Sequence, residues 1–437
     1  MKKILPLAAF VIGTYILSGQ SLYFPPAGST TWDTMSPSDL GWCQPNIDSL
    51  YNFLQSKNTD AFIVLKDGKM VIEKYFGTFT VDSIHDWYSA SKSLTSMLTG
   101  IALQNNIINL DSPATHYLGV GWTSETPQQE DSITLLNLIT MTSGTSPAPT
   151  GNCTNTDTTA ACLQYEVPAG AQWAYHTGAY RKEETVLTNA SGRSYDALSQ
   201  IYLGSVTGMT GLWYSQEFIS TTRSAARFGL LALNKGVWNG DTLLRDTAYY
   251  NAMIHTSQNY NLSYGYLWWL NGQASYMLPQ SQVVYTGELV PNAPPDMFCA
   301  LGKYDQKIYV VPSANMVIVR MGGSADSVAD ASSAFDNEVW GKLDSLTCSP
   351  APLAVNNVSP VHQINIHPNP ISDLVYFDMN ISNSYKTIYI YNMLGQLVAE
   401  HPYSAKLNLT SLIADMYIVR ITDVDDNVVV TAKMVKQ

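Results

Sequence analysis

A Ser-x-x-Lys motif at the start of an apolar helix is the feature that most limits how this chain can fold. Ser89 and Lys92 form the only such motif in the sequence, and apolar residues follow at Leu94, Met97 and Ile101. This spacing predicts a buried amphipathic helix. Residues three apart lie on one face of a helix, so the hydroxyl and the amine are expected to meet at its first turn.

The pairing of these two side chains suggests nucleophilic chemistry. A serine hydroxyl is a poor nucleophile until a neighbouring base takes its proton. Lysine serves as that base only when burial or nearby positive charge lowers its pKa from about 10.4. The helix N-terminus adds backbone N–H groups that can stabilise a negative oxygen. The alternative is an ordinary capped helix with its lysine in solvent, and the motif alone does not separate the two.

The order of predicted elements indicates an α+β domain whose terminal segments share one antiparallel sheet. A helix over residues 46–54 precedes strands at 61–65 and 70–76, which Asp67-Gly68 joins as a hairpin. A helical middle follows, and strands return before a closing helix. The further elements expected from periodicity are helices at 89–105, 133–141, 180–190, 196–203, 220–234 and 328–346, and strands at 264–270 and within 297–320.

Composition limits the partners of the chain. At 437 residues it is long enough for two domains, and its net charge of −12 comes without a basic cluster, so no nucleic-acid partner is expected. The seven histidines are scattered without a His-Glu-x-x-His motif, and no Cys-x-x-Cys spacing occurs. Neither a metal site nor a cofactor is therefore expected.

The N-terminus is typical of an export signal. Lys2 and Lys3 precede an apolar run from Ile4 to Leu17 that is short for a membrane span, which predicts a signal peptide over residues 1–19. No cysteine follows the run directly, which argues against a lipoprotein. An uncleaved anchor is the alternative.

Export permits disulfides, and five cysteines are available for them. Cys153 and Cys162 bracket a polar loop and are predicted to pair. Cys43 and Cys348 stand at the two ends of the main domain, where a bond between them would join its termini. Cys299 then remains as a buried free thiol.

A proline-containing linker over residues 349–362 separates the main domain from a C-terminal module. The module alternates apolar and polar residues in short strands. These strands are expected at 374–379, 387–391, 416–422 and 428–434, with a turn at 425–427. The pattern predicts a small all-β sandwich over residues 363–437.

Several short segments follow one another along the main domain in a recognisable order. They are Ser89-Ala90-Ser91-Lys92, Ile133-Thr134-Leu135, Thr142-Ser143-Gly144, Pro168-Ala169-Gly170, Tyr175-His176-Thr177, the helix at 220–229, the strand at 264–269, and Ala300-Leu301-Gly302 with Gln306. In this order they resemble the serine β-lactamase-related hydrolases, specifically the class C β-lactamase and esterase branch. The resemblance covers roughly residues 43–346.

The resemblance implies a β-lactamase/transpeptidase-like fold, with an antiparallel sheet beside a helical region, and roles for three side chains. Ser89 would attack an acyl carbon, while Lys92 and Tyr175 would remove and return the proton. A tyrosine near a cationic lysine has its pKa lowered, so a phenolate base is expected. The oxyanion would be held by the Ser89 N–H and by one N–H near residues 301–303.

Substrate contacts are also implied by the resemblance. Four residues occupy positions of the family's substrate-contacting motifs: Thr177, Leu301, Gly302 and Gln306. Residue 300 is alanine, whereas the family's third motif opens with a cationic or histidine-type residue that helps to bind a substrate carboxylate. Strand alternation points nearby Lys303 to the opposite face from position 300. An uncharged ester or amide is therefore expected, as in the esterase and nylon-oligomer-hydrolase branch.

The C-terminal module carries its own set of motifs. They are Ile366-His367-Pro368-Asn369-Pro370, the stretch at 390–398, Met416-Tyr417-Ile418-Val419, and Lys433-Met434-Val435-Lys436. Together, over residues 363–437, they resemble a type IX secretion sorting domain. This implies the outer-membrane secretion machinery as a partner and export through the periplasm to the cell surface or the medium. A small carbohydrate-binding or adhesive sandwich is the alternative.

The leading hypothesis is a secreted serine hydrolase that acts on a small-molecule or short-peptide acyl substrate. Three alternatives stay open: a catalytically inactive binding protein on the same fold, a D-amino-acid peptidase or β-lactamase proper, and an adhesive protein whose β module is the working part. A Ser-His-Asp enzyme is disfavoured because the sequence has no Gly-x-Ser-x-Gly motif.

Overall fold

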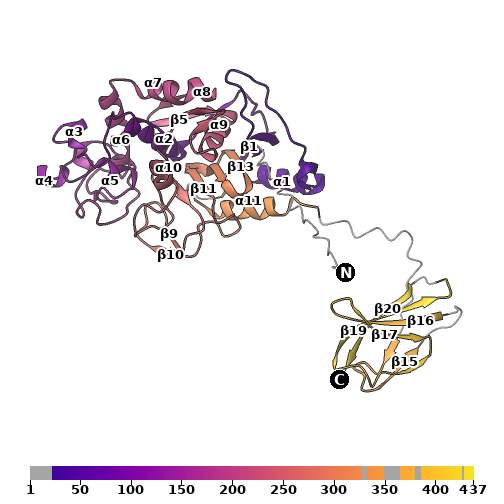
Figure 1. Ribbon diagram of the computed structural model, residues 1–437. Helices are drawn as coiled ribbons and strands as arrows, with labels where there is room; N and C mark the ends of the chain where they lie inside the picture. The colour runs from indigo at the N-terminus through magenta and orange to yellow at the C-terminus, as the bar shows by residue number, and fades with distance from the viewer. Residues whose placement is uncertain (1–21, 327–331, 349–364, 379–384, 426–427) are drawn as a thin grey trace, which may run out of the picture. The chain divides into compact units, whose positions relative to one another are not determined.

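The computed structural model describes residues 22–326, 332–348, 365–378, 385–425 and 428–437. The chain divides into two compact units, one ending at Cys348 and one beginning at Ser349 (Figure 1). The predicted signal peptide over residues 1–19 and the predicted linker over residues 349–362 lie outside the described residues.

A six-stranded antiparallel sheet is the frame of the first unit. Its strand order is β2-β1-β13-β12-β11-β8, so the N-terminal hairpin lies beside the last strands of the unit. The strands are β1 (Thr59–Lys66), β2 (Lys69–Tyr75), β8 (Trp269–Leu270), β11 (Phe298–Gly302), β12 (Gln306–Val311) and β13 (Met316–Gly322). The prediction that the terminal segments share one antiparallel sheet is confirmed.

Four helices position this sheet. The helix α9 (Thr222–Leu233) packs on β1, β12 and β13, and α2 (Ser91–Gln104) packs on β11. The helix α1 (Gln44–Ser56) packs on β1 and on α11 (Ala334–Asp344). Gly229 allows the close approach of α9, because a Cβ there would lie 2.5 Å from a methyl carbon of Val317.

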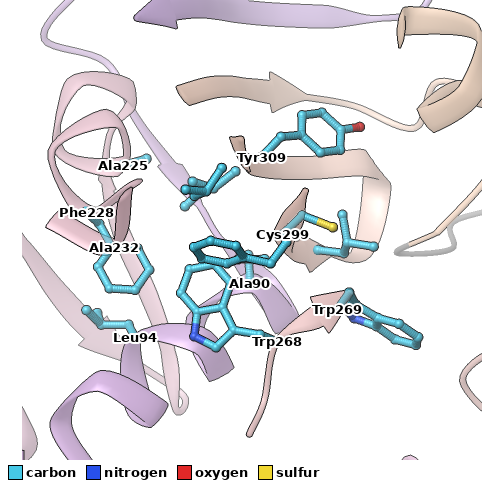
Figure 2. Packing of buried hydrophobic residues seen from close by; sticks show 14 of the residues in the cluster. Ala90, Leu94, Ala225, Phe228, Ala232, Trp268, Trp269, Cys299 and Tyr309 are labelled. Carbon is cyan, nitrogen blue, oxygen red and sulfur yellow. The ribbon is translucent and has the colours of Figure 1, made fainter. Parts of the chain in front are cut away.

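An aromatic cluster joins α2 and α9 to the sheet (Figure 2). Trp268 stacks on Phe228 with 5.7 Å between ring centroids and meets Phe298 edge-on at 5.1 Å. Leu94 of α2 and Cys299 of β11 are buried in the same cluster. Full burial of one such side chain contributes about 1.5–3 kcal/mol, so the cluster holds the helix that carries Lys92 firmly against the sheet.

The remaining elements of the first unit lie outside the six-stranded sheet. They are η1 (Pro37–Leu40), β3 (Ile84–Asp86), η2 (Tyr88–Ala90), α3 (Thr115–Leu118), α4 (Pro127–Glu130), α5 (Leu135–Ile139), η3 (Ala160–Cys162), α6 (Thr177–Ser191), α7 (Tyr195–Ser199), the π-helix η4 (Gln200–Gly204), α8 (Ser205–Thr207), β4 (Gly211–Tyr214), β5 (Glu217–Thr221), β6 (Val237–Trp238), β7 (Asp241–Thr242), α10 (Thr247–Met253), β9 (Ser275–Met277), β10 (Val284–Thr286), η5 (Lys303–Asp305) and η6 (Pro312–Ala314).

Some predicted elements are shorter than the sequence suggested. The helix expected over 133–141 is confined to α5, because the Thr134 side chain caps its start and Met141 takes a left-handed φ of 59° after its end. The helix expected from residue 220 begins at Thr222, because Glu217–Thr221 pairs as strand β5 with β3 and β4. Of the strand expected over 264–270, only β8 forms.

Both predicted disulfides are present. Cys153 is bonded to Cys162, and Cys43 to Cys348, while Cys299 is a free, buried cysteine. Cys43 caps the start of α1 and Cys348 lies beyond α11, so their bond joins the two ends of the first unit.

The second unit is all-β. One sheet has the order β14-β15-β18 and the other β17-β16-β19-β20, with buried apolar side chains such as Ile388 and Val419 in its core. The strands are β14 (Asn365–His367), β15 (Leu374–Asp378), β16 (Tyr385–Asn392), β17 (Leu397–Pro402), β18 (Lys406–Asn408), β19 (Asp415–Asp423) and β20 (Val428–Lys436). The predicted fold class, an α+β domain followed by a small all-β module, is confirmed. No helix among the described residues has the length and apolarity needed to cross a membrane.

Candidate active site

A single turn between β3 and α2 carries Ser89. Residues Tyr88–Ala90 form the 3₁₀ turn η2, which runs directly into α2. Tyr88 adopts a left-handed backbone with a φ of 47°, and its N–H donates a hydrogen bond of 2.7 Å to Asp86 Oδ1. The turn therefore presents Ser89 from a fixed backbone at the N-terminal end of a buried helix.

Lys92 lies behind this serine, inside the protein. Its Nζ is 3.0 Å from Ser89 Oγ and sits over the rings of Tyr175 and Tyr180, 5.1 and 4.8 Å from their centroids. It forms no ion pair with any described residue, and only 4 % of it is exposed. Burial, and then the positive charge of Arg181, lowers the pKa of Lys92 to about 7. A neutral amine beside the hydroxyl is the state that can accept its proton.

Tyr175 enters the site from the segment that precedes α6. Its ring stacks on Trp269 at 5.9 Å, and its hydroxyl lies near enough to Ser89 for that side chain to act on its pKa. The prediction of a lowered pKa and a phenolate is wrong. Burial raises the pKa of Tyr175 well above its ordinary value, and this outweighs the opposing effect of Ser89. The phenol therefore keeps its proton.

Ser89 and Tyr175 line one cavity of about 590 Å³. The other residues of its wall are Tyr88, Asn155, Thr156, Thr177, Arg181, Glu217, Pro279, Gln280, Lys303 and Tyr304. Of the four predicted substrate contacts, Thr177 alone belongs to this described wall. The cavity is lined mainly by hydroxyl, amide and charged groups, which suits a polar organic molecule. Nowhere in the described ranges do three His, Cys, Asp or Glu side chains gather as metal ligands.

The end of β11 lies against the turn that carries the serine. Leu301 and Gly302 are buried, and a Cβ on Gly302 would lie 2.1 Å from the Trp87 carbonyl oxygen and 3.2 Å from the Ala90 nitrogen. Only glycine allows this approach. Leu301 and Gly302 thus bring their backbone, and not their side chains, toward the nucleophile.

The structure corrects the expected direction of Lys303. Strand β11 ends at Gly302, and residues 303–305 form the turn η5, in which Tyr304 has a φ of 61°. Side chains alternate only within a strand, so the alternation that was expected to turn Lys303 away stops one residue earlier. Lys303 instead lines the cavity as an exposed cation.

Gln306 is also placed differently from its predicted role as a substrate contact. Its side chain is fully buried, and its amide group bonds both the N–H and the carbonyl of Gly322, at 3.0 and 2.6 Å. The same amide donates to the Tyr304 carbonyl at 2.9 Å. Gln306 is therefore occupied in holding the turn η5 and has no group left for a substrate.

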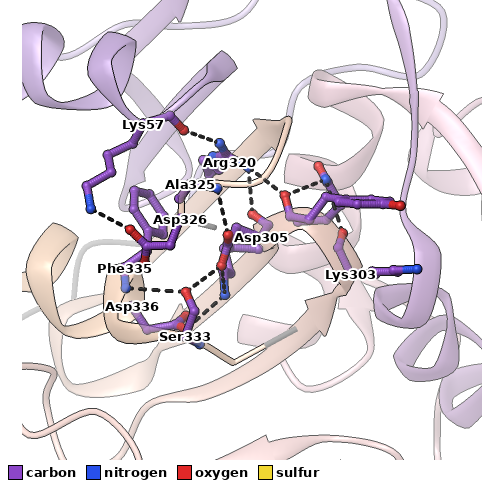
Figure 3. Close-up of polar contacts among 12 residues, drawn as sticks. Lys57, Lys303, Asp305, Arg320, Ala325, Asp326, Ser333, Phe335 and Asp336 are labelled. Carbon is purple, nitrogen blue, oxygen red and sulfur yellow. Dashed lines mark hydrogen bonds and ion pairs between the residues drawn. The ribbon is translucent and has the colours of Figure 1, made fainter. Parts of the chain in front are cut away.

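A buried network of charged groups around Asp305 holds the turn η5 in place (Figure 3). The Asp305 carboxylate lies 3.1 Å from Lys307 Nζ and accepts a hydrogen bond of 2.7 Å from Ser333. Lys307 Nζ is also 2.8 Å from Asp336, on the first turn of α11. Arg320 donates to the carbonyl oxygens of residues 304 and 305, at 2.9 and 3.1 Å.

Arg181 and Glu217 add charges to the cavity wall that the sequence did not predict. Arg181 Nη2 is 3.3 Å from Glu217 Oε1, and the Glu217 carboxyl group also shares a hydrogen bond with Asp86. Burial, and then the charge of Asp86, raises the pKa of Glu217. Arg181 lies four residues after Thr177 on α6, so helical spacing could have placed it on the same face. No comparable signal marks Glu217.

Two parts of the chain match the models of known families. Residues 54–218 match the model of the Beta-lactamase family, and residues 365–437 match that of the Secretion system C-terminal sorting domain. The chain joins a beta-lactamase-family domain to a secretion sorting domain. The first unit is thus a serine hydrolase domain, and the sorting domain indicates export through type IX secretion to the cell surface or outside the cell.

Solved structures share the fold of the beta-lactamase-family domain. A putative 6-aminohexanoate-dimer hydrolase from Bacillus anthracis is 20% identical with a TM-score of 0.54, over 75% of this chain and 87% of that chain. A putative beta-lactamase from Bacteroides dorei is 15% identical with a TM-score of 0.55, over 70% and 99%. FmtA from Staphylococcus aureus is 13% identical with a TM-score of 0.51, over 74% and 94%. Comparison with curated protein sequences gave no match.

Proposed function

We propose that the beta-lactamase-family domain hydrolyses an ester or amide bond of a small acyl substrate through an acyl-enzyme on Ser89. The observation that carries the proposal is the 3.0 Å contact between Ser89 Oγ and the buried Nζ of Lys92, whose pKa is lowered to about 7. A neutral lysine at that distance can take the serine proton without any further rearrangement.

Acylation uses three side chains in turn. Ser89 Oγ bonds to the acyl carbon while its proton passes to Lys92 Nζ. The Tyr175 hydroxyl, which keeps its proton in the resting site, gives that proton to the departing alcohol or amine and regains one from Lys92. Water then attacks the acyl carbon while Lys92 Nζ takes one of its protons. The bond between the acyl carbon and Ser89 Oγ breaks, and the proton passes from Lys92 to Ser89 Oγ, which restores the hydroxyl and releases the acid. The N–H of Ser89 and an N–H near residues 301–303 hold the oxyanion.

The cavity supports a small polar substrate. Its volume of about 590 Å³ suits a molecule the size of a short peptide or a small ester. The sequence predicts an uncharged substrate because residue 300 is alanine and Lys303 is expected to point away from the site. Arg181 and Lys303 both line the cavity, so the lack of a cation no longer argues against a substrate with a carboxylate. The two substrate classes to compare are a simple ester and a linear amide. The amide is suggested by the 6-aminohexanoate dimer after which the Bacillus anthracis neighbour is named.

Labelling with a fluorophosphonate probe tests this proposal directly. The wild-type chain should acquire one adduct on Ser89, and Ser89→Ala should acquire none. Hydrolysis of p-nitrophenyl esters, D-amino-acid amides and a chromogenic cephalosporin then separates an esterase or amidase from a D-amino-acid peptidase or β-lactamase proper. Absence of an adduct on the folded wild-type protein would support the inactive binding protein instead.

We also propose that residues 363–437 are an export address removed at the cell surface. Mass spectrometry of the secreted protein should find an end near the linker over residues 349–362. Glycan binding by the secreted full chain, lost when the module is removed, would support the adhesive alternative.

A further inference from the structure

Two tyrosines on the cavity wall have backbones that tyrosine rarely adopts. Tyr88 has a φ of 47° and Tyr304 a φ of 61°, both in the left-handed region, where a Cβ is unfavourable. Their rings meet edge to face, with centroids 5.1 Å apart and planes 70° from parallel. Such strain persists only where the surroundings enforce it, and it concentrates at functional sites.

Each of these backbones is held by groups outside the described cavity wall. Asp86 fixes Tyr88 by accepting its N–H at 2.7 Å. The carbonyl of Tyr304 accepts hydrogen bonds from Arg320 and from Gln306, both at 2.9 Å, and Figure 3 shows Arg320 among the polar contacts around Asp305. The two rings are therefore held in contact by two independent sets of bonds.

The contact joins the two segments that would supply the oxyanion donors of the proposed reaction. Tyr88 directly precedes Ser89, which supplies one N–H. Tyr304 lies two residues beyond Gly302, whose Cα approaches the serine turn so closely that a Cβ would overlap the Trp87 carbonyl. Both tyrosines line the cavity, so their ring contact connects the two segments proposed to carry the oxyanion donors.

We propose that Tyr88 and Tyr304 form an aromatic cover over the oxyanion hole of this hydrolase. The proposal rests on the proposed function. The rings exclude water from the two N–H donors, and these donors stabilise a developing negative oxygen more strongly where water is absent. They act on the reacting atoms only through the donors that they cover, so they are positioning residues.

Substitutions at Tyr304 separate this role from a structural one. Tyr304→Phe keeps the ring and should retain kcat within about threefold, whereas Tyr304→Ala and Tyr304→Gly should both lower kcat by roughly 10- to 100-fold with little change in KM. Glycine suits the left-handed backbone better than alanine, so Tyr304→Gly should melt at a higher temperature than Tyr304→Ala. Equal loss of activity at unequal stability is not expected of a purely structural residue.

A boronic acid that forms a tetrahedral adduct with Ser89 provides the second measurement. Its inhibition constant should rise by about the same factor as kcat falls in Tyr304→Ala, because both report the oxyanion. Tyr214→Ala is the matched control, since Tyr214 is 68 % exposed on β4 and does not line the described cavity wall. Tyr88→Phe and Tyr88→Ala repeat the comparison if the Tyr304 variants do not fold.

The outcomes distinguish the cover from the proposed function itself. Loss of labelling in Ser89→Ala with unchanged kcat and boronate affinity in Tyr304→Ala overturns the cover and leaves the hydrolase standing. A raised KM for bulky acyl groups at constant kcat makes the ring pair a specificity wall and also overturns the cover. Hydrolysis that survives in Ser89→Ala overturns both proposals.

Discussion

Two lysines are buried among the described residues of the first unit, Lys92 and Lys307, and they differ in the groups around their amines. Lys307 is fully buried with the Asp305 and Asp336 carboxylates 3.1 and 2.8 Å from its Nζ. Lys92 is buried to nearly the same degree but has a serine hydroxyl and two aromatic rings around its amine. No carboxylate among the described residues forms an ion pair with it.

This difference separates a structural cation from a chemical base. Burial would raise the pKa of Asp305, but Lys307 and hydrogen bonds from Ser333 and Ala325 outweigh it, so that pKa falls below its ordinary value. The network therefore stays charged and holds the turn η5. Burial without a counter-ion lowers the pKa of Lys92 to about 7, so a large fraction of the molecules carry a neutral amine beside Ser89 near pH 7.

The largest effect is expected from removing the amine of Lys92. Lys92→Met should lower kcat/KM for the best ester by about 10³- to 10⁵-fold, because Ser89 loses its base. Lys74→Met, at a lysine that meets the rings of Tyr51 and Phe76 and does not line the described cavity wall, is the control and should stay near wild type. Activity of Lys92→Met within tenfold of wild type would mean that another group is the base.

The matching change at Lys307 should lower the stability of the folded protein. Lys307→Met leaves Asp305 and Asp336 buried without their cation and should lower the free energy of unfolding by about 3–5 kcal/mol in urea titrations. Its activity per folded molecule should fall far less than that of Lys92→Met. Combining it with Asp336→Leu should restore part of the lost stability, and a further loss in the double variant would argue against a charged network.

Lys92→Met should have the opposite effect on stability. The folded-state pKa of Lys92 lies below its unfolded value, so the wild-type protein gains stability as pH rises from about 7 to 10.4. In the wild-type protein, folding near pH 7 requires an amine that is charged in the unfolded chain to lose its proton, which costs free energy. Lys92→Met avoids this cost and should be more stable by on the order of 1–4 kcal/mol near pH 7, with the advantage fading toward pH 10. Urea titrations across this range measure it. A variant that is less stable than wild type at pH 7 would show that the amine is charged and satisfied.

The smallest effects are shifts of the pH profile. Activity should rise with pH through about 7 as Lys92 loses its proton, while Tyr175 stays protonated. Glu217→Gln removes a negative charge that raises the lysine pKa, so the rise should move to lower pH; Arg181→Gln should move it to higher pH. Each shift should be less than about one pH unit in kcat/KM profiles. Two shifts in the same direction would contradict this arrangement.

Much of the frame followed from the sequence because it depends on local patterns. The structure has the hairpin at Asp67-Gly68 and the helix after Ser89, each of which has a local sequence signal. It also has both disulfides, which were predicted from the export signal and the positions of the cysteines. The meeting of Ser89 and Lys92 also follows from spacing along one helix.

The details that failed depend on what surrounds each residue. The pKa of Tyr175 rises because the ring is buried, and the sequence motif does not report burial. Lys303 lines the cavity because β11 ends at Gly302, one residue before it. The nearby sequence carries no clear signal for where a strand ends. Gln306 is used by Gly322 and Tyr304, contacts that only the folded sheet creates.

The bond between Cys43 and Cys348 has a consequence for how long the enzyme lasts outside the cell. It closes a loop with a sequence separation of 305, just before the chain passes to the sorting domain. If a protease cuts the chain after Cys348, the new C-terminus stays covalently attached to Cys43 at the start of α1. Local unfolding from the cut end is therefore opposed by the disulfide. Maturation by cleavage and resistance to further digestion can therefore coexist in the same molecule.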